Sequence, residues 1–432
     1  MLHPRNVVCP LVTNAVKTPV ATESAPFPYV ALFVLATAVF MSVTAEMMPT
    51  GLLPEMSAEL GVTESQIGLL VTLFAVAVVI TAVPLSAMTR RFSRHTVIVG
   101  VLLAVAATST FSALAPSYGL LAFARVLGGT AHGLFWAVVG VYAAHLVPRH
   151  QIARAVAITT GGGTLAFVLG VPAATVVGHA FGWRVPFLAI AVLSLCASLL
   201  IAKRLPRMPA PGPRVKPAPD ARAEPSSETG VKLSRLKRLD PTVPGVAVIC
   251  VIIGILMVGH YSLYTYVTPF LIGQLGVPIG NVGGMLFVYG VAGALGLLIA
   301  GFVFGGRPTF GVGIALVVTG ASVLVLSLWA SNPWLSIPAF ALWGIALGVI
   351  PTLMQARVLH VASPAITDTA AAFYSTAFNI GIGGGALVGG LLLSGFGLES
   401  LPLFYLLLLF VSGALLWISV IVSHRRHAAT LA

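Results

Sequence analysis

Apolar residues dominate long stretches of the chain, and short polar segments separate these stretches. Each apolar run is long enough to cross about 30 Å of hydrocarbon as an α-helix. The runs lie at residues 28–53, 65–88, 97–115, 119–147, 155–180 and 185–202, and then at 243–272, 279–304, 311–330, 334–359, 369–396 and 401–423. The pattern therefore predicts twelve membrane-spanning helices.

An internal repeat relates the first six predicted helices to the last six. Shifting the chain by 215 residues without a gap places Leu60-Gly61-Val62 on Leu275-Gly276-Val277 and Phe181-Gly182 on Phe396-Gly397. The same register pairs Pro54 with Pro269, Gly68 with Gly283, Gly129 and Gly133 with Gly344 and Gly348, His145 with His360, and Gly170 with Gly385. Many secondary transporters are built from such repeats. We therefore predict an all-α membrane protein with two six-helix bundles related by a parallel internal repeat.

The segments between the apolar runs suggest five regions. These are a disordered cytoplasmic tail at 1–27, an N-terminal bundle at 28–202, a cytoplasmic linker at 203–242, a C-terminal bundle at 243–423 and a cytoplasmic tail at 424–432. The first tail has no long apolar core, so it is not interpreted as a cleaved signal peptide. The linker is interpreted as flexible, with a short amphipathic helix at 231–239 on anionic lipid as the alternative.

Composition excludes a soluble protein, since 58% of the residues are hydrophobic and only 8% are charged, against about 25% charged residues in soluble domains. The formal net charge of +12 would suggest a nucleic-acid partner in a soluble chain. Here the basic residues instead gather in loops of one parity, which is typical of cytoplasmic loops. We therefore expect a multi-pass protein of a bacterial inner (plasma) membrane, with both termini cytoplasmic and no nucleic-acid partner.

The charged residues that indicate this topology fall into two sets. The predicted cytoplasmic set comprises Arg90, Arg91, Arg94, Arg149, Arg154, Arg307, Arg357, Arg425, Arg426 and ten Lys or Arg between Lys203 and Arg238. The opposite set comprises Arg184, Glu55, Glu59, Glu64 and Glu399. The three cysteines, Cys9, Cys196 and Cys250, have no pairing or metal-ligand spacing. No disulfide, metal or cofactor is therefore expected.

Glu46 is the one acidic residue within a predicted span. A carboxylate in hydrocarbon costs a few kcal/mol, so it is expected to face a cavity or a partner. The alternative is an interfacial residue that contacts water, because Pro49 and Pro54 follow closely. Arg125 in the fourth span lies at a similar depth and is the expected partner, either directly or through substrate and water.

The fourth span carries further candidates on the same helical face as Arg125. Gly129, His132 and Trp136 follow at helical spacing, which predicts a polar and aromatic face unlike a lipid-facing stripe. His132 is a candidate for proton coupling because histidine titrates near neutral pH. A hydrogen-bonded packing residue is the alternative.

The second half contains no carboxylate at the matching positions, since Glu46 corresponds to Tyr261 and Arg125 to Phe340. It instead supplies aromatic and hydrogen-bonding residues that suit a neutral or amphipathic ligand. The substrate-binding candidates are Trp136, His260, Tyr261, Tyr264, Tyr289, Gln355, Tyr374 and Asn379. Aromatic residues also anchor spans at membrane interfaces, which is the alternative for each of them.

Glycines cluster in the fifth and eleventh spans, which are repeat mates. The candidates are Gly170, Gly178 and Gly385, with Pro172 beside the first of them. Small residues let helices approach closely. Tight packing is one interpretation, and sliding contact between the two halves is a compatible second one.

These motifs resemble the major facilitator superfamily, and within it the twelve-span drug:proton antiporters, over nearly the whole chain. Thr44-Ala-Glu-Met-Met-Pro-Thr-Gly-Leu-Leu-Pro54 is similar to the first-span signature of the sugar-efflux, arabinose-efflux, chloramphenicol-resistance and purine ribonucleoside efflux subgroup. Arg125-Val-Leu-Gly-Gly-Thr-Ala-His-Gly-Leu-Phe-Trp136 matches its fourth-span motif, whose arginine is implicated in proton coupling. Leu169-Gly-Val-Pro-Ala-Ala-Thr-Val-Val-Gly178 resembles the antiporter motif of the fifth span.

Two positions depart from the family pattern. The loop after the second span normally carries a glycine and an aspartate before its basic cluster, whereas Ser86 and Arg90 occupy those places ahead of Arg91 and Arg94. In the fifth span a valine separates Gly170 from Pro172, so only the subgroup's version of the motif fits.

The resemblance implies a proton-coupled exporter that moves a small amphipathic molecule such as a drug, sugar or nucleoside by alternating access. It implies a transporter and not an enzyme. The expected partners are the substrate, protons and lipid, and a monomer is the family expectation. An uptake symporter or facilitator of the same fold is the alternative. A membrane enzyme or receptor is a remote one, because only the central segment is long enough for a catalytic site and it contains no recognisable motif.

Overall fold

The computed structural model describes residues 27–148, 151–204 and 240–431. The predicted tail at 1–27 except Phe27, most of the linker with its alternative helix at 231–239, and Cys9 lie outside the described residues. Within the described part, every regular element is helical, and twelve helices are long and apolar enough to span a membrane. The prediction of an all-α protein with twelve spans is therefore confirmed.

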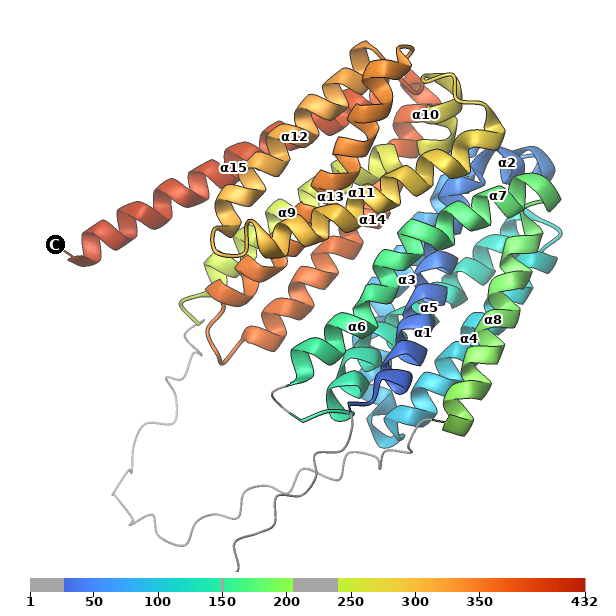
Figure 1. Ribbon diagram of the computed structural model, residues 1–432, viewed down its shortest axis with the longest axis horizontal. Helices are drawn as coiled ribbons and strands as arrows, with labels where there is room; N and C mark the ends of the chain where they lie inside the picture. Colours follow the sequence, from blue (N-terminus) through green and yellow to red (C-terminus); the bar gives the residue numbers. More distant parts are fainter. Residues whose placement is uncertain (1–26, 149–150, 205–239, 432) are drawn as a thin grey trace, which may run out of the picture.

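All helices of the first half precede those of the second half along the chain, and each half forms its own group of helices (Figure 1). The first half contains α1 (Tyr29–Gly51), α2 (Leu53–Leu60), α3 (Glu64–Met88), η1 (Thr89–Arg91), α4 (Arg94–Leu114), α5 (Tyr118–His145), α6 (Ile152–Leu165), the π-helical turn η3 (Ala166–Gly170), α7 (Val171–Phe181) and α8 (Arg184–Arg204). The second half contains α9 (Val243–Tyr264), α10 (Val267–Gly273), η4 (Ile279–Asn281), α11 (Val282–Phe302), α12 (Pro308–Leu328), α13 (Pro333–Val361), α14 (Thr367–Phe396) and α15 (Ser400–Leu431).

The backbone confirms the internal repeat at its turns. Four described glycines have a positive φ, namely 64° at Gly61, 67° at Gly276, 90° at Gly182 and 82° at Gly397. They form two pairs of repeat mates. Gly61, Gly182 and Gly397 directly follow α2, α7 and α14, where a glycine with a positive φ ends the helix, and Gly276 lies three residues after α10. The sequence match at these glycines therefore reflects the same chain reversals in both halves.

Prolines interrupt the first and seventh spans at matching places. Proline lacks the N–H that would bond to the carbonyl four residues earlier. Pro54 thus leaves the carbonyl of Thr50 free beside the break between α1 and α2, and Pro269 does the same to Thr265 between α9 and α10. The seventh span was predicted to be continuous over 243–272; the structure divides it at residues 265–266 because Pro269 follows.

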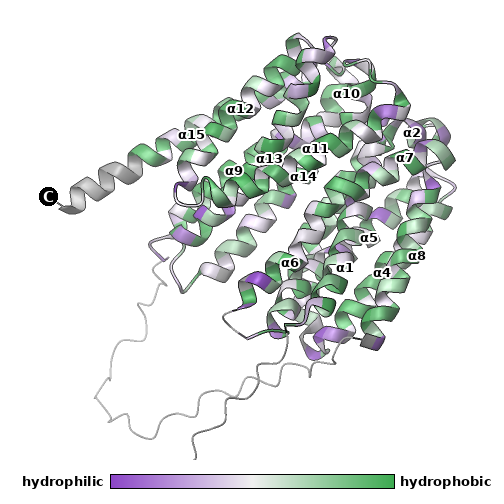
Figure 2. Cartoon of the chain, viewed as in Figure 1, coloured by the Kyte–Doolittle hydropathy of each residue, from purple (hydrophilic) through white to green (hydrophobic). Residues whose placement is uncertain are grey.

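The bundle has two chemically different ends. Arg91, Lys203 and Arg307 mark the end that we call the basic end, and Glu55, Glu59, Glu64 and Glu399 mark the acidic end. Purple, hydrophilic residues gather at these ends, and green, apolar residues cover the length of the helices (Figure 2). At the acidic end, Glu55 pairs with His179 and Glu59 with Arg184, which joins α2 to the α7–α8 turn.

The two halves meet near the acidic end. Thr268 Oγ1 donates a 2.9 Å hydrogen bond to the Thr50 carbonyl that Pro54 left free. Thr72 Oγ1 donates to the Gly383 carbonyl at 3.0 Å. The halves diverge toward the basic end, where α6 and α14 lie apart (Figure 1).

Glycines bring helices together both within and between the halves. A Cβ on Gly170 would lie 2.1 Å from Thr44 Oγ1, and one on Gly385 would lie 2.6 Å from the Val258 carbonyl, so both glycines pack within their own halves. Gly178 likewise packs against Leu52 of its own half. These three glycines therefore do not form the predicted sliding contact between the two halves. Cross-half contacts involve Gly283 and Gly290 of α11 and Gly383 of α14, and a Cβ on Gly283 would lie 3.2 Å from the carbonyl of the predicted motif residue Pro172.

The cross-half contacts of Gly383 and Gly290 are related by the internal repeat. Gly383 approaches Ala75 of α3, and Gly290 approaches Val168 of η3. Shifting one pair by 215 positions produces the other, since 75 becomes 290 and 168 becomes 383. The interface is therefore organised about a pseudo-twofold axis between the halves.

Candidate functional site

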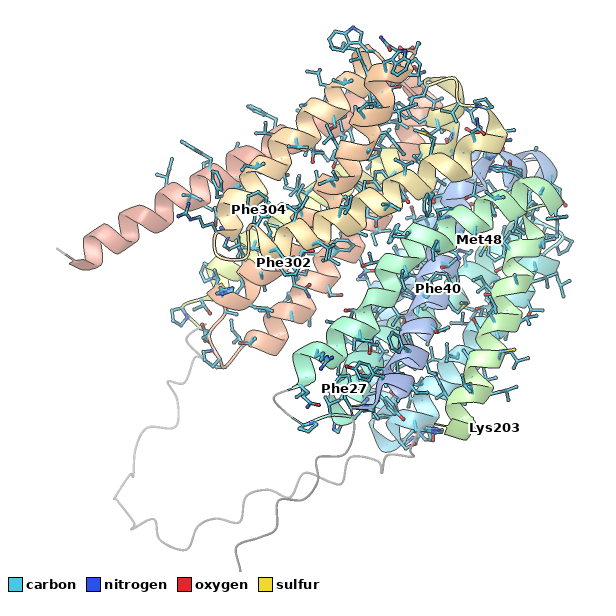
Figure 3. All side chains as sticks on the ribbon, viewed as in Figure 1. Phe27, Phe40, Met48, Lys203, Phe302 and Phe304 are labelled. Carbon is cyan, nitrogen blue, oxygen red and sulfur yellow. The ribbon has the colours of Figure 1, made fainter. Side chains whose placement is uncertain are left out.

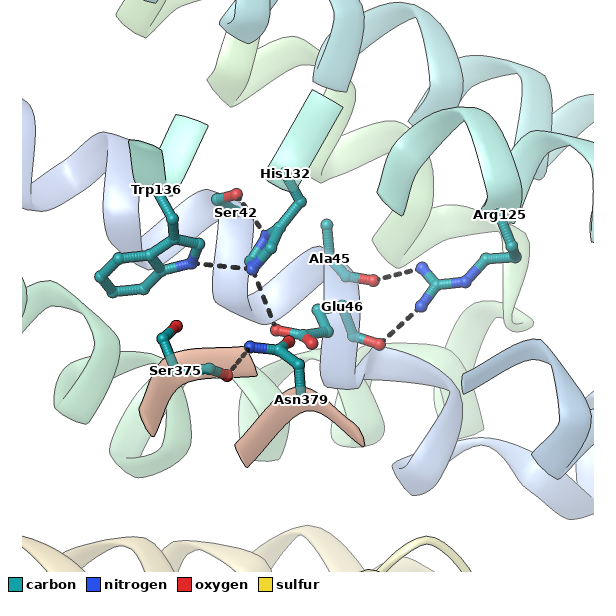
Figure 4. Close-up of polar contacts among 8 residues, drawn as sticks. All are labelled: Ser42, Ala45, Glu46, Arg125, His132, Trp136, Ser375 and Asn379. Carbon is teal, nitrogen blue, oxygen red and sulfur yellow. Dashed lines mark hydrogen bonds and ion pairs between the residues drawn. The ribbon is translucent and has the colours of Figure 1, made fainter. Parts of the chain in front are cut away.

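Glu46 lies on α1 in the interior of the bundle, with only 5% of its surface exposed. Its Oε2 atom is 3.3 Å from Nε2 of His132 (Figure 4). Its Oε1 atom is buried and has no hydrogen-bond partner among the described residues. Glu46 is therefore not the water-contacting interfacial residue of the alternative interpretation.

The expected side-chain pair between Arg125 and Glu46 does not form. Arg125 Nη1 donates to the carbonyl of Ala45 at 2.6 Å, and Nη2 donates to the main-chain carbonyl of Glu46 at 2.7 Å (Figure 4). The cause lies in α1, where Pro49 lacks the N–H that would bond the Ala45 carbonyl. The arginine satisfies this free carbonyl, and its guanidinium carbon lies 4.3 Å from the centre of the Phe74 ring.

His132 connects Glu46 to Trp136. The Trp136 indole donates to His132 Nε2 at 2.8 Å, and His132 Nδ1 lies 2.8 Å from Ser42 Oγ. Because an indole N–H can only donate, Nε2 accepts and Nδ1 carries the ring proton to Ser42. A proton on Nε2 would face the indole N–H, so pairing of a charged His132 with Glu46 requires Trp136 to move away.

A small cavity of about 10 Å³ lies beside this network. Ser42, Thr108, Ser109, Ser112 and Arg125 are among its lining residues. The volume is about that of one water, and Arg125 Nε is buried without a partner among the described residues. The α4 hydroxyl residues escaped the sequence analysis because serine and threonine are common in spans and carry no charge.

In the second half, His260 lies inside an aromatic cluster. Its ring stacks on Tyr264 at 5.3 Å and lies 5.3 Å from Trp343 and 6.0 Å from Tyr405. His260 is fully buried, and neither ring nitrogen has a hydrogen-bond partner among the described residues. His260 and Tyr264 therefore form a packed core in this conformation, away from the surface of the cavity described next.

A cavity of about 230 Å³ opens between the halves beside this cluster. Of the predicted substrate-binding residues, it contains Tyr261 and Tyr289. Its other walls come from Gly163, Thr164 and Phe167 of the first half, and from Gly290, Gly293, Ala294, Leu297, Leu347, Gly348, Pro351, Thr352 and Phe378 of the second. The cavity is thus aromatic and apolar, with a few hydroxyl groups.

The repeat identifies which of these wall residues lie near the axis. Gly163 and Phe378 are repeat mates, and both line the cavity. Glu46 and Tyr261 are also repeat mates, one in each half. The pairing of Gly163 with Phe378 follows from the sequence alone. It could therefore have identified Phe378 as a candidate substrate-binding residue.

The other predicted substrate-binding residues do not line the cavity between the halves. Gln355 is exposed away from the cavity, and the Tyr374 hydroxyl donates to the Pro351 carbonyl at 2.7 Å. Asn379 of α14 donates to its own helix at the Ser375 carbonyl at 2.9 Å (Figure 4). Trp136 is 39% exposed, which makes it the accessible member of the Glu46 network.

The predicted loop motif lies at the basic end, far along α3 from the cavity. Arg91 is exposed and its guanidinium carbon lies 4.9 Å from the centre of the Phe92 ring. Arg94 is the first residue of α4 and is half-buried. The side chain of Arg90 lies outside the described part of the chain.

Comparison with known proteins gives a consistent result. The family model described as Major Facilitator Superfamily matches residues 35–362 and 249–431. The fold is similar to a bacterial homologue of the human lysosomal transporter Spinster in an inward-facing, unoccupied conformation, with a TM-score of 0.73 and 14% identity over 92% of this chain and 97% of that one. The occupied form of that homologue gives a TM-score of 0.69 at 16% identity, over 92% and 97% of the two chains.

A nucleoside transporter, NupG, has a similar fold as well. Its structure, determined on a point mutant, gives a TM-score of 0.72 and 13% identity over 90% of this chain and 99% of that chain. At these identities the likeness concerns the fold. The polar network around Glu46 and the cavity beside Tyr261 must therefore be interpreted from their own chemistry.

Proposed function

This chain belongs to the Major Facilitator Superfamily, and on that basis we propose that it is a proton-coupled antiporter that exports a small amphipathic molecule by alternating access. Glu46 is the proton carrier in this proposal, Arg125 and His132 support it, and the cavity beside Tyr261 and Tyr289 receives the substrate. The motifs shared with the sugar, arabinose, chloramphenicol and ribonucleoside exporters favour the export direction.

The observation that carries the proposal is that the described residues show no side-chain ion pair between Glu46 and Arg125. Arg125 is committed to two main-chain carbonyls, which leaves one carboxylate oxygen without a partner among the described residues. An isolated charge is costly in a buried site, and proton uptake relieves that cost. Glu46 is thus built to exchange a proton and not to remain in a permanent ion pair.

Coupling follows from the position of Glu46 on α1, which contacts the second half one turn later through the hydrogen bond from Thr268 to the Thr50 carbonyl. Rocking of the halves would expose the carboxyl to one side of the membrane and then the other, together with the substrate cavity. Each proton that moves inward contributes about 2.3 kcal/mol per 100 mV. Release of the proton toward the basic end would return Glu46 to the charged form and favour the next rotation.

The proposed orientation places the basic end in the cytoplasm of a bacterial cell, following the distribution of Lys and Arg. The separation of α6 from α14 at that end would then correspond to an inward-open state (Figure 1). A monomer suffices for this mechanism, because both halves of the site come from one chain.

The sign of proton movement tests the proposal. A growth-inhibition panel of antibiotics, sugars and nucleosides in an exporter-deficient host first supplies a transported probe. Adding that probe to everted vesicles with an acidic lumen should drive protons out of the lumen as the probe enters. Movement of the probe and protons in the same direction would instead establish symport, and probe movement without protons would establish a facilitator.

A further inference from the structure

An apolar groove runs along the outer surface of the first half, away from the substrate cavity. It has a volume of about 540 Å³, and its walls include Val97, Gly100, Val101 and Ala104 of α4 and Leu127 and Ala131 of α5. Leu127 belongs to an exposed apolar face of α5 that also includes Leu120 and Phe123. This face has no protein cover in the described chain, so the groove opens toward the hydrocarbon of the membrane.

The groove begins at the basic end and follows α4 inward. Thr89, Phe92 and Thr96 form its mouth, and Thr108 lies at its inner limit. Twelve residues separate Thr96 from Thr108, which corresponds to about 18 Å of helix. One leaflet of a bilayer contributes about 15 Å of hydrocarbon, so the groove has the length of one acyl chain.

Two arginines stand at the mouth. Arg91 follows Thr89 on η1, and Arg94 shares the helical face of Val97 and Val101. Side chains on a helix lean toward its N-terminus, which directs Arg94 toward the basic end. Arg94 Nη1 is buried and has no hydrogen-bond partner among the described residues.

These arginines have no carboxylate nearby in their own bundle. No Asp or Glu occurs between Glu64 and Asp220. The earlier carboxylates of the described first half are Glu46 in the interior and three at the acidic end, and none of the described ion pairs includes either arginine. The described part of the first half therefore offers these two arginines no counter-charge.

We propose that this groove is a binding site for an anionic phospholipid, with one acyl chain along α4 and the phosphate at Arg91 and Arg94. Basic residues at a membrane surface attract anionic headgroups, and Arg offers a planar fork that matches phosphate oxygens. The site shares no lining residue with the substrate cavity, and its inner limit, Thr108, also lines the small cavity beside Arg125. It does not depend on the direction of transport.

The second half provides an internal comparison. Phe304 is the repeat mate of Thr89, and Gly311 is the mate of Thr96. A Cβ on Gly311 would lie 2.7 Å from Cβ of Phe304, which shows that this phenylalanine fills the space equivalent to the mouth of the groove. Figure 3 shows Phe304 at the α11–α12 connection. In the second half, Phe304 therefore occupies the place that corresponds to the mouth of the groove, near the basic residue Arg307.

Native mass spectrometry of the purified full chain tests the site, with dioleoyl phosphatidylglycerol and dioleoyl phosphatidylethanolamine as probes. The wild type should retain one phosphatidylglycerol more strongly than phosphatidylethanolamine. The double variant Arg91→Gln/Arg94→Gln should weaken this adduct by about fivefold for each arginine. Thr89→Phe, which installs the residue of the second half, should remove the adduct while leaving both charges. Arg307→Gln is the matched control and should bind as the wild type does.

A second measurement covers the case in which Thr89→Phe does not fold. Phosphatidylglycerol with a photoreactive acyl chain should label the peptide that contains Gly100 and Ala104 in the wild type, and much less in the double arginine variant. Equal binding of the two lipids, unchanged binding in the arginine variant, or labelling confined to other helices would each overturn the proposal. Loss of transport with lipid binding intact would concern the proposed function alone.

Discussion

The two halves of this protein place different chemistry on the same backbone. Around Arg125, the first half has a guanidinium on the Phe74 ring and a carboxyl group at Glu46. At the mates of Phe74 and Arg125, the second half has the rings of Tyr289 and Phe340 with centres 5.1 Å apart. The helix ends, the glycine turns and the contacts between the halves are related by the internal repeat. The charged residues Glu46 and Arg125 are not, because their mates are Tyr261 and Phe340.

The difference suggests a division of labour. The carboxyl, guanidinium and imidazole groups in the first half are suited to proton exchange. The aromatic rings of the second half are suited to contact with an amphipathic molecule. If this division is correct, substitutions at repeat mates should have different effects on coupling and on substrate affinity.

The largest effect is expected at Arg125. Arg125→Ala leaves two buried carbonyls without their donors, which costs about 1–3 kcal/mol for each, and it removes the positive charge near Glu46. Pump activity should fall by about 100-fold or more, which corresponds to that loss, and Arg125→Lys should recover little because a single ammonium does not replace the fork. Transport and thermal melting of the purified protein measure both effects.

The matched control at this position is Phe340→Leu. It changes the mate of Arg125 without touching a charge, so coupling should persist with an altered substrate affinity. Equal loss of proton coupling in Arg125→Lys and Phe340→Leu would contradict the proposal that the first half exchanges protons and the second half contacts the substrate.

A smaller effect is expected at Trp136. Trp136→Phe removes the donor to His132 Nε2, whose lone pair then becomes available to Glu46. One hydrogen bond is worth about 1 kcal/mol, so the pH for half-maximal transport should move by about one unit at most. Measuring transport across a pH series, with the exposed Trp334 changed to Phe as the control, separates this effect from the loss of an indole ring.

Tyr289→Phe should change substrate affinity and leave coupling intact. The Tyr289 hydroxyl is buried without a partner among the described residues, and the residue lines the cavity between the halves. Loss of one hydrogen bond to the substrate corresponds to a rise in KM of about fivefold. Tyr374→Phe is a useful comparison, because that hydroxyl bonds to the Pro351 carbonyl; a larger rise in KM there would place the substrate elsewhere.

The smallest effect concerns the start of the second half. Hydrogen bonds from Ser363 and then Thr242 hold the pKa of Asp240 below its ordinary value of 3.8. A carboxyl with a lowered pKa in the folded state stabilises the fold at neutral pH, and this contribution is lost as the pH falls through that pKa. Asp240→Asn should lower the melting temperature by about 1–2 °C at pH 7, and the difference should shrink below pH 4. If the difference in melting temperature stayed constant across this pH range, Asp240 would stabilise the fold through packing and not through its charge.

The sequence predicted the fold well because its signals are local. Apolar runs give the spans, and Gly61, Gly182 and their mates mark the turns of both halves. The break in the seventh span was missed, although Pro269 was present, because a proline near the end of a span does not always interrupt a helix. The cytoplasmic placement of the termini remains a prediction.

The site was predicted only in part because it depends on contacts between helices. Spacing placed Arg125 and His132 near Glu46, yet it could not show that Pro49 frees a carbonyl for the arginine. His260 and Tyr264 share a helical face with Tyr261, but only packing against α13 reveals that they are buried in the aromatic cluster.

Proton movement in the Glu46→Gln variant tests the central claim most directly. Purified protein in liposomes that contain a pH-sensitive dye can be assayed for exchange of labelled probe and for proton flux when probe is added. Glutamine keeps the shape of the side chain and cannot release a proton, so exchange should continue while probe-driven proton flux disappears. Proton flux at the wild-type rate in this variant would contradict the assignment of Glu46 as the proton carrier.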